Sequence, residues 1–97
     1  MITVLVDGEN VRRSLWPNLS REELVERSDA WGAQNGHEVL VVWEGAETAD
    51  DRIARKVTEL APPLWVVTSD RELRRRVEPH VERIVGGGSF ARELQRR

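Results

Sequence analysis

The chain has no cysteine among its 97 residues. A disulfide framework and a thiolate metal site are therefore both excluded, and the protein does not depend on an oxidising compartment for stability. No apolar run approaches the roughly 18 residues that a membrane span requires, and the first residues do not form a basic segment followed by a cleavage site. From these absences we expect a soluble, cytoplasmic protein.

A large net charge is also missing, because 15 basic and 17 acidic residues give a net charge of −2. The two parts of the chain differ, however: residues 1–70 hold 13 acidic and 7 basic residues, whereas residues 71–97 hold 4 acidic residues and 8 arginines. An acidic total argues against bulk attraction to nucleic acid, yet an arginine surface beside an acidic centre can bind phosphates through a metal. A solvated helix face is the simpler explanation of the arginines.

The length of the chain limits its organisation. A chain of 97 residues buries roughly two-thirds of the surface that its unfolded form exposes, which is enough for one hydrophobic core. The sequence has no internal repeat, linker or low-complexity segment. We therefore expect one domain over residues 1–97.

Short strands alternate with helices along the chain. Four segments rich in β-branched residues are predicted strands, at residues 2–6, 38–43, 64–68 and 81–85. Helical patterns lie at residues 20–36, 48–60, 69–77 and 89–97. Because the first three strands are nearly continuous apolar runs, they are typical of parallel strands covered on both faces. The pattern predicts an α/β fold, namely a three-layer α/β/α sandwich with a short, mainly parallel four-stranded sheet.

Polar residues at three positions predict where helices begin. Ser20 with Glu23 forms a capping box, and Ser69 with Glu72 forms a second one. Ser89 is the expected N-cap of the last helix, after a glycine-rich turn. That glycine-rich turn is only a weak signal for a phosphate site, because the lysine and hydroxyl of a P-loop do not follow it.

Acidic residues follow three predicted strands, and the carboxyl ends of parallel strands meet at one edge of a sheet. Asp7 follows the first strand, Glu44 the second and Asp70 the third, while Asp50 begins the helix after the second strand. Crowded carboxylates raise one another's pKa unless a cation neutralises them. Oxygen ligands of this kind suit Mg²⁺ or Mn²⁺ rather than Zn²⁺. Gly8 would let the backbone or a ligand approach Asp7 closely.

Each acid also has a purely structural explanation. Asp70 would be favourable in the first turn of its helix, and Asp51 could complete a cap with Thr48. Asp50 precedes Ile53 by three residues, which places it on the stripe of the helix that faces the sheet. Taken singly, each acid is better explained as a cap or turn residue. Taken jointly, three acids at one edge favour a metal site.

Four motifs resemble, in the same order, the NYN domains of the PIN-like nuclease superfamily, and the YacP-like ribonuclease branch most closely. They are "VLVDGEN" (residues 4–10), "ETADDRI" (47–53), "VVTSDRELR" (66–74) and "GGGSFARELQR" (86–96). The resemblance extends from residue 2 to about residue 94, and the second and third motifs in tandem are fairly specific. It implies a single NYN/PIN-like domain with a Mg²⁺- or Mn²⁺-dependent ribonuclease site.

The resemblance also implies roles for particular residues. The family's catalytic metal ligands match Asp7, Asp50 and Asp70, with Asp51 as a helper. Asn10 and Ser69 would orient ligands or water molecules around them. The second strand leads to Glu44 and Gly45 where relatives often have Asp-Gly, so Glu44 and Glu47 stay secondary candidates and Glu9 stays unassigned.

We expect the substrate to be single-stranded RNA, cleaved by a water molecule that the metal activates. The arginines expected to hold backbone phosphates are Arg12, Arg52, Arg71, Arg74 and Arg75. Residues 74–76 are all arginine, and one helix cannot turn all three toward the site. Trp16, in a predicted loop, could stack on an unpaired base if it lies near the site, whereas Trp43 is ambiguous.

Other functions fit parts of the pattern. The main alternative is a non-catalytic metal- or RNA-binding module within a larger complex, and a homodimer or a complex with RNA-processing machinery is compatible with either function. A receiver domain would need a lysine late in the sequence, and the last lysine is Lys56. A haloacid-dehalogenase-like phosphatase would need Asp-x-Asp after the first strand, where the chain has Asp7, Gly8 and Glu9. Endonucleolytic and exonucleolytic cutting stay equally open.

Overall fold

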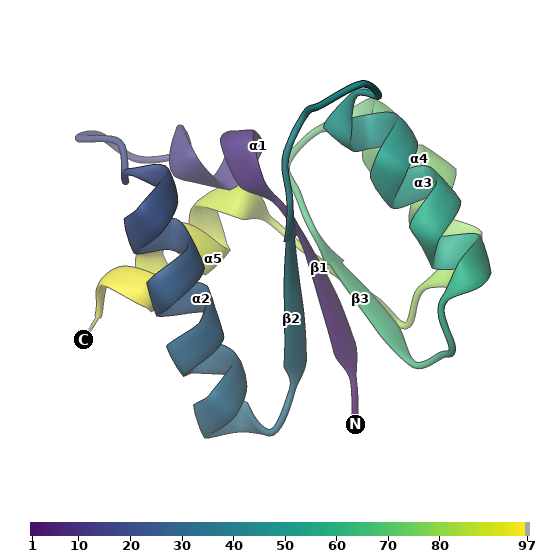
Figure 1. Ribbon diagram of the computed structural model, residues 1–97, viewed down its shortest axis with the longest axis horizontal. Helices are drawn as coiled ribbons and strands as arrows, with labels where there is room; N and C mark the ends of the chain where they lie inside the picture. The colour runs from purple at the N-terminus through teal and green to yellow at the C-terminus, as the bar shows by residue number, and fades with distance from the viewer. Residues whose placement is uncertain (97) are drawn as a thin grey trace.

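The computed structural model describes residues 1–96 and contains one four-stranded sheet between two layers of helices (Figure 1). The strands are β1 (Thr3–Asp7), β2 (Glu38–Val42), β3 (Leu64–Val67) and β4 (Arg83–Val85). The helices are α1 (Gly8–Arg12), α2 (Arg21–Asn35), α3 (Ala49–Glu59), α4 (Arg71–Val77) and α5 (Gly87–Gln95), and a short 3₁₀ helix, η1 (Glu78–His80), follows α4. The predicted α/β class is confirmed.

The strand order is β2-β1-β3-β4, and all neighbouring strands are parallel. The chain moves outward from β1 to β2 and then crosses back to β3 on the other side of β1, so the strand order reverses between β1 and β3. Open parallel sheets bind ligands at the carboxyl ends of the strands on either side of such a reversal. Asp7 ends β1 at this place, and Thr68 directly follows β3.

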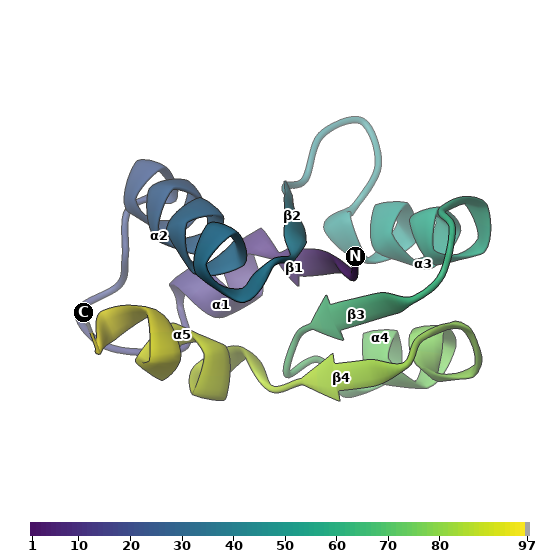
Figure 2. The same cartoon turned by 90° about the horizontal axis from the view of Figure 1, so that it is seen from below.

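Helices α1, α2 and α5 cover one face of the sheet, and α3 and α4 cover the other (Figures 1 and 2). Side chains of β1 alternate between the two faces, as the pleat of a strand requires. Val4 and Val6 belong to the core under α1, α2 and α5, whereas Leu5 belongs to the core under α3 and α4. All three are fully buried, which explains why β1 reads as a continuous apolar run.

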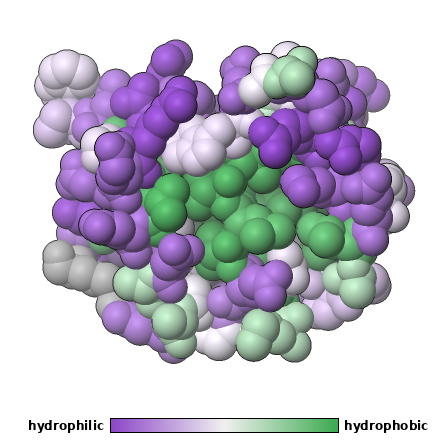
Figure 3. All heavy atoms as spheres, viewed as in Figure 1, coloured by the Kyte–Doolittle hydropathy of each residue, from purple (hydrophilic) through white to green (hydrophobic). Residues whose placement is uncertain are grey.

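The edge strand β2 is covered less completely. Figure 3 shows an apolar region in the middle of the face that Figure 1 presents, where β2 lies, with hydrophilic residues on both sides. Val39, Leu40 and Val41 of β2 are half-buried and pack against the edges of the two cores. Among residues 1–96, no helix has the length and hydropathy needed to cross a membrane.

The start of α2 confirms one predicted capping box. The side chain of Ser20 accepts a hydrogen bond from the backbone of Glu23, and the Glu23 side chain accepts one from the backbone of Ser20. Two orphan N–H groups of the helix are satisfied in this way.

Two other predicted caps are wrong. The N-cap of α4 is Asp70, whose carboxylate accepts a hydrogen bond from the backbone N–H of Leu73 at 2.9 Å. Ser69 does not cap α4, because its hydroxyl accepts a hydrogen bond from the backbone N–H of Gly87 at 2.8 Å. Helix α5 begins at Gly87 rather than after Ser89, since the glycines themselves adopt helical geometry after the N-cap, Gly86.

Candidate active site

A cavity of about 700 Å³ opens at the carboxyl edge of the sheet. Its wall comes from the end of β1, from α1, from the segments that follow β2 and β3, and from the start of α3 and α5. Five acidic residues line it: Asp7, Glu9, Glu44, Asp50 and Asp70. The structure thus brings Asp7, Asp50 and Asp70 to one place from three separate segments, and the catalytic role of the three stays a prediction.

Asp7 is buried at the base of this cavity. Its side chain is 5% exposed and makes no capping hydrogen bond, although Asp7 occupies the N-cap position of α1. Its Oδ2 accepts a hydrogen bond at 2.8 Å from the hydroxyl of Thr68, which is itself fully buried. The Thr68 oxygen also accepts a hydrogen bond from the backbone N–H of Asp70 at 3.1 Å. Thr68 therefore ties the ends of β1 and β3 together, a role that its position in the sequence did not indicate.

The electrostatic surroundings of Asp7 oppose its ionisation. The pKa of Asp7 is raised to about 6, mainly by burial and also by the negative charges of Asp50, Asp70 and Glu44, while the hydrogen bond from Thr68 lowers it. A carboxylate with these neighbours favours either a proton or a cation beside it.

Asp50 and Asp51 are neighbours in the chain but have different surroundings. Asp50 is half-buried in the first turn of α3, and desolvation together with the charge of Asp70 raises its pKa above the ordinary value. Asp51 is exposed and accepts a hydrogen bond at 3.0 Å from Arg76 of α4. The side chain of Asp51 therefore points to α4, and the residue does not line the cavity.

Of the two secondary candidates, Glu44 and Glu47, only Glu44 lines the cavity. Glu44, directly after β2, lines the cavity and contributes to the raised pKa of Asp7. Glu47 does not line the cavity, and its exposed carboxylate forms an ion pair with Arg55 of α3.

Asn10 and Ser69 belong to one hydrogen-bonded group. The side-chain oxygen of Asn10 accepts a hydrogen bond from the backbone N–H of Ser69 at 2.9 Å, and the Ser69 hydroxyl accepts one from Gly87. A Cβ on Gly87 would lie 2.6 Å from that Asn10 oxygen, so any other residue there would have to displace the Asn10 side chain from its bond to Ser69. These contacts hold α1, the segment after β3 and the start of α5 in a fixed arrangement around the cavity.

Gly8 provides clearance for a side chain. A Cβ on Gly8 would lie 2.5 to 2.9 Å from ring atoms of Trp43, which packs over this position. The guanidinium of Arg21 also stacks on Trp43, with its central carbon 5.0 Å from the centre of the ring. Trp16 is 88% exposed and does not line the cavity.

The structure distributes the five predicted phosphate-binding arginines widely. Arg12 lies against Glu9 and the carbonyl of Leu19, and Arg52 donates to the carbonyl of Trp43 at 2.9 Å. The other three lie on the exposed surface of α4, namely Arg71, Arg74 and Arg75. Arg75 pairs there with Glu72. None of the five lines the cavity. Arg13 lines it instead, although the sequence motifs did not indicate this residue.

The donors present at the cavity suit a hard divalent cation, because they are carboxylate and amide oxygens. Within residues 1–96, no three His, Asp or Glu side chains lie close enough together to hold one ion between them. Mg²⁺ is commonly bound in proteins through one or two carboxylates, with water and substrate phosphates completing its shell. The residues therefore fit a cation that one or two acids anchor, rather than a closed cage of three.

No protein-family model matches the chain, and no sequence among curated proteins matches it. Among solved structures, the chain is similar to a mutant of Rae1 (YacP) from Bacillus subtilis, with a TM-score of 0.82 and 24% sequence identity. The match covers 98% of this chain and 76% of that one. At this level of identity the likeness concerns the fold, and it shows that the chain adopts the fold of that protein.

Proposed function

We propose that the protein is a divalent-metal-dependent ribonuclease that hydrolyses phosphodiester bonds of single-stranded RNA in the acidic cavity. The observation that carries the proposal is the burial of Asp7 at the strand-order reversal, where Asp50, Asp70 and Glu44 line the same cavity; burial and, to a lesser extent, these charges raise the pKa of Asp7 to about 6. Such a concentration of negative charge costs folding free energy, and neither the capping of α4 by Asp70 nor the bond from Thr68 to Asp7 requires the other acids beside them. The shared fold and the NYN-like motifs support the same function.

Asp7 and Asp50 are the proposed anchors of Mg²⁺ or Mn²⁺, and Asp70 acts beside them. When bound, such a cation supplies a water molecule of lowered pKa and neutralises charge on phosphate oxygens. Thr68 keeps the Asp7 carboxylate in one orientation through its hydrogen bond. Asp70 has one carboxylate oxygen engaged as the cap of α4, which leaves the other free for water or metal.

The decisive experiment compares the parent protein with Asp7→Asn on a labelled single-stranded RNA in the presence of Mn²⁺. The substitution keeps the shape of the side chain and removes its charge, so we expect cleavage to fall by at least about a hundredfold while the far-ultraviolet circular dichroism stays unchanged. Asp29→Asn is the matched control, because Asp29 is an exposed carboxylate of α2 outside the cavity. If Asp7→Asn cuts as fast as the parent, the assignment is wrong.

A circular RNA of the same sequence is the second substrate for the parent protein. Only an endonucleolytic cut opens a circle, so this substrate separates endonuclease from exonuclease activity. Cleavage of the linear RNA alone would identify an exonuclease.

A non-catalytic RNA-binding module is the second candidate. The separation of the acidic side chains, no three of which gather around one point among residues 1–96, favours it. A protein that binds the RNA but leaves it intact at every Mg²⁺ and Mn²⁺ concentration would have this function.

A further inference from the structure

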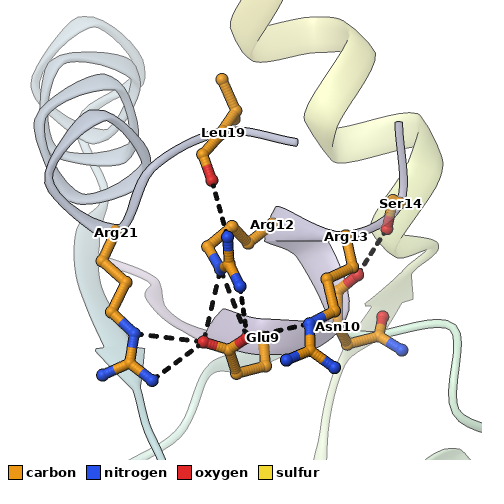
Figure 4. Close-up of polar contacts among 7 residues, drawn as sticks. All are labelled: Glu9, Asn10, Arg12, Arg13, Ser14, Leu19 and Arg21. Atoms are coloured by element: carbon orange, nitrogen blue, oxygen red, sulfur yellow. Dashed lines mark hydrogen bonds and ion pairs between the residues drawn. The ribbon is translucent and has the colours of Figure 1, made fainter. Parts of the chain in front are cut away.

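Glu9 is the centre of a cluster of three arginines beside the acidic cavity (Figure 4). Arg12 donates to both carboxylate oxygens of Glu9, at 3.0 Å from Nη2 and 3.2 to 3.3 Å from Nε. Arg13 contacts Oε2 through Nε at 3.1 Å. Arg21, from the start of α2, contacts Oε1 through Nε and Nη2, both at 3.1 Å. Two helices thus direct their arginines at one carboxylate that is 17% exposed.

The cluster has more positive charge than Glu9 neutralises, because three guanidinium groups surround a single carboxylate. The hydrogen bond from Arg12, together with the charges of all three arginines, lowers the pKa of Glu9, so Glu9 stays ionised at neutral pH. An excess of two positive charges remains at this point of the surface, next to the acidic residues of the cavity.

The three arginines are not equivalent. Arg12 has its side-chain nitrogens engaged, since Nε and Nη2 donate to Glu9 and Nη1 donates to the carbonyl of Leu19 at 3.2 Å. Arg13 and Arg21 are 66% and 61% exposed. Among the contacts of residues 1–96, Arg13 uses only Nε and Arg21 uses Nε and Nη2, so both Nη groups of Arg13 and the Nη1 of Arg21 are available to a ligand.

The available nitrogens lie beside the proposed reaction centre. Glu9 and Arg13 line the cavity together with Asp7, which precedes Glu9 by two residues. Arg21 stacks on Trp43, whose ring covers Gly8 between Asp7 and Glu9. An ion pair with Glu9 holds the guanidinium of Arg13, and an ion pair with Glu9 together with stacking on Trp43 holds that of Arg21, so a ligand does not have to order two free arginine side chains.

We propose that Arg13 and Arg21, held in place by Glu9, form a subsite for backbone phosphates of single-stranded RNA next to the acidic cavity. Guanidinium groups match the geometry of phosphate oxygens and keep their charge at any physiological pH. The inference rests on the proposed function and adds to it the part of the surface on which the strand lies. Arg12 is a positioning residue in this subsite, because its donors are already engaged.

Binding of a fluorescein-labelled, single-stranded RNA, measured by anisotropy at several salt concentrations, tests the subsite. All proteins carry Asp7→Asn so that the RNA stays intact. Arg13→Gln and Arg21→Gln are each expected to weaken binding about fivefold and to reduce the slope of log affinity against log salt by about one, as the loss of one phosphate contact predicts. Unchanged affinity and slope in both variants would overturn the proposal.

Arg55→Gln is the matched control. Arg55 is also an exposed arginine that pairs with two carboxylates, Glu47 and Glu59, but it lies on α3 and does not line the cavity. Its removal is expected to leave both affinity and salt slope unchanged. A loss equal to that of Arg13→Gln would show that only the total charge of the protein matters, and the subsite would then be wrong.

Glu9→Gln separates positioning from simple charge. The substitution removes a negative charge near a polyanion, so electrostatics alone predicts tighter binding. If Glu9 holds the arginines in place, binding weakens instead, because the two guanidinium groups lose their common partner and must be ordered by the ligand. Tighter binding by Glu9→Gln would refute the positioning role of Glu9.

The outcomes also separate this proposal from the proposed function. A parent protein that cleaves RNA while the arginine variants bind normally would retain the ribonuclease assignment and lose the subsite. A parent protein that never cleaves, but needs Arg13 and Arg21 for binding, would retain the subsite and lose the hydrolytic assignment.

Discussion

Asp7 carries a carboxylate that is 5% exposed and whose pKa burial raises to about 6 from an ordinary value of 3.8. Below pH 3.8 the carboxyl group is protonated in both the folded and the unfolded protein, so it does not affect their balance. Between pH 3.8 and 6 the unfolded chain releases the proton more readily, and the folded state loses stability as the pH rises. Above pH 6 the full cost is about 3 kcal/mol.

Asp7→Asn is therefore expected to stabilise the protein at pH 7.5 in the presence of EDTA, by up to about 3 kcal/mol, because the amide has no charge to bury. The gain should disappear at pH 3.5. Urea unfolding at the two pH values measures both quantities. A variant that is less stable than the parent at pH 7.5 would show that the Asp7 charge is compensated in the folded protein.

Gly8→Ala is expected to destabilise the protein by about 1 to 3 kcal/mol, because the new methyl group would overlap the Trp43 ring. Thermal unfolding of Gly8→Ala measures the loss. The double variant with Trp43→Leu should recover part of it, since the smaller side chain removes the overlap. Gly45→Ala is the control, as the nearest atom to its added Cβ would lie at 3.6 Å. A Gly8→Ala protein as stable as the parent would contradict the packing explanation.

At the scale of single residues, the sequence predicted that Asp7, Asp50 and Asp70 lie at one edge of the sheet, but it did not predict what surrounds them. Asp7, Asp50 and Asp70 follow strands or begin a helix, and such positions converge in any parallel sheet. The hydroxyl of Thr68 beside Asp7 and the contact of Arg21 with Glu9 depend on side-chain directions set by tertiary packing. Glycine is needed at position 8 because the Trp43 ring packs against it, and Trp43 lies 35 positions away in the sequence.

At the scale of elements, Asp70 both caps a helix and lines the cavity. Asp70 caps α4 through one oxygen and contributes negative charge to the cavity. Its charge is also among the causes of the raised pKa of Asp7 and of Asp50.

Asp70→Asn and Asp70→Ala are expected to separate the two roles. Asparagine caps a helix about as well as aspartate, so Asp70→Asn should unfold close to the parent, whereas Asp70→Ala should lose about 1 kcal/mol. Both variants remove the charge, and both should lower the rate of RNA cleavage by similar factors. If only Asp70→Ala were impaired in cleavage, Asp70 would act solely as a cap.

At the scale of elements, the periodicity of apolar residues was sufficient to predict four strands and the main helices. The caps were predicted less well, because a serine hydroxyl can satisfy partners outside its own helix. Ser69 bonds to Gly87 of α5 instead of capping α4, and nothing near Ser69 in the sequence indicates that contact. Local motifs identify a cap only where no tertiary partner competes for the side chain.

The molecule as a whole has two cores on opposite faces of the sheet, and all tryptophans except Trp16 pack in the core under α1, α2 and α5. Leu5 points into the other core, under α3 and α4. Both cores depend on the same central strand, β1, so they are expected to unfold together.

Leu5→Ala is expected to cost about 2 to 5 kcal/mol, because it leaves a cavity beside a central strand. Tryptophan fluorescence and far-ultraviolet circular dichroism should report the same lowered midpoint in urea, although the substitution is in the core without tryptophan. Two separate transitions would contradict a single cooperative unit.

The arrangement of the sheet was predictable because alternating strands and helices allow few topologies. The distances between carboxylates were not, since they depend on backbone register and side-chain rotamers together. Whether the acidic cavity holds a metal is therefore the question on which the functional account depends.

Crystals soaked in Mn²⁺ answer it most directly, through the anomalous scattering of the ion. We expect a strong peak within about 2.5 Å of a carboxylate oxygen of Asp7, on the side of the cavity that Asp50 also lines. The peak should be absent from crystals of Asp7→Asn. Mn²⁺ bound elsewhere on the protein with no peak at Asp7, at a saturating concentration, would contradict the account.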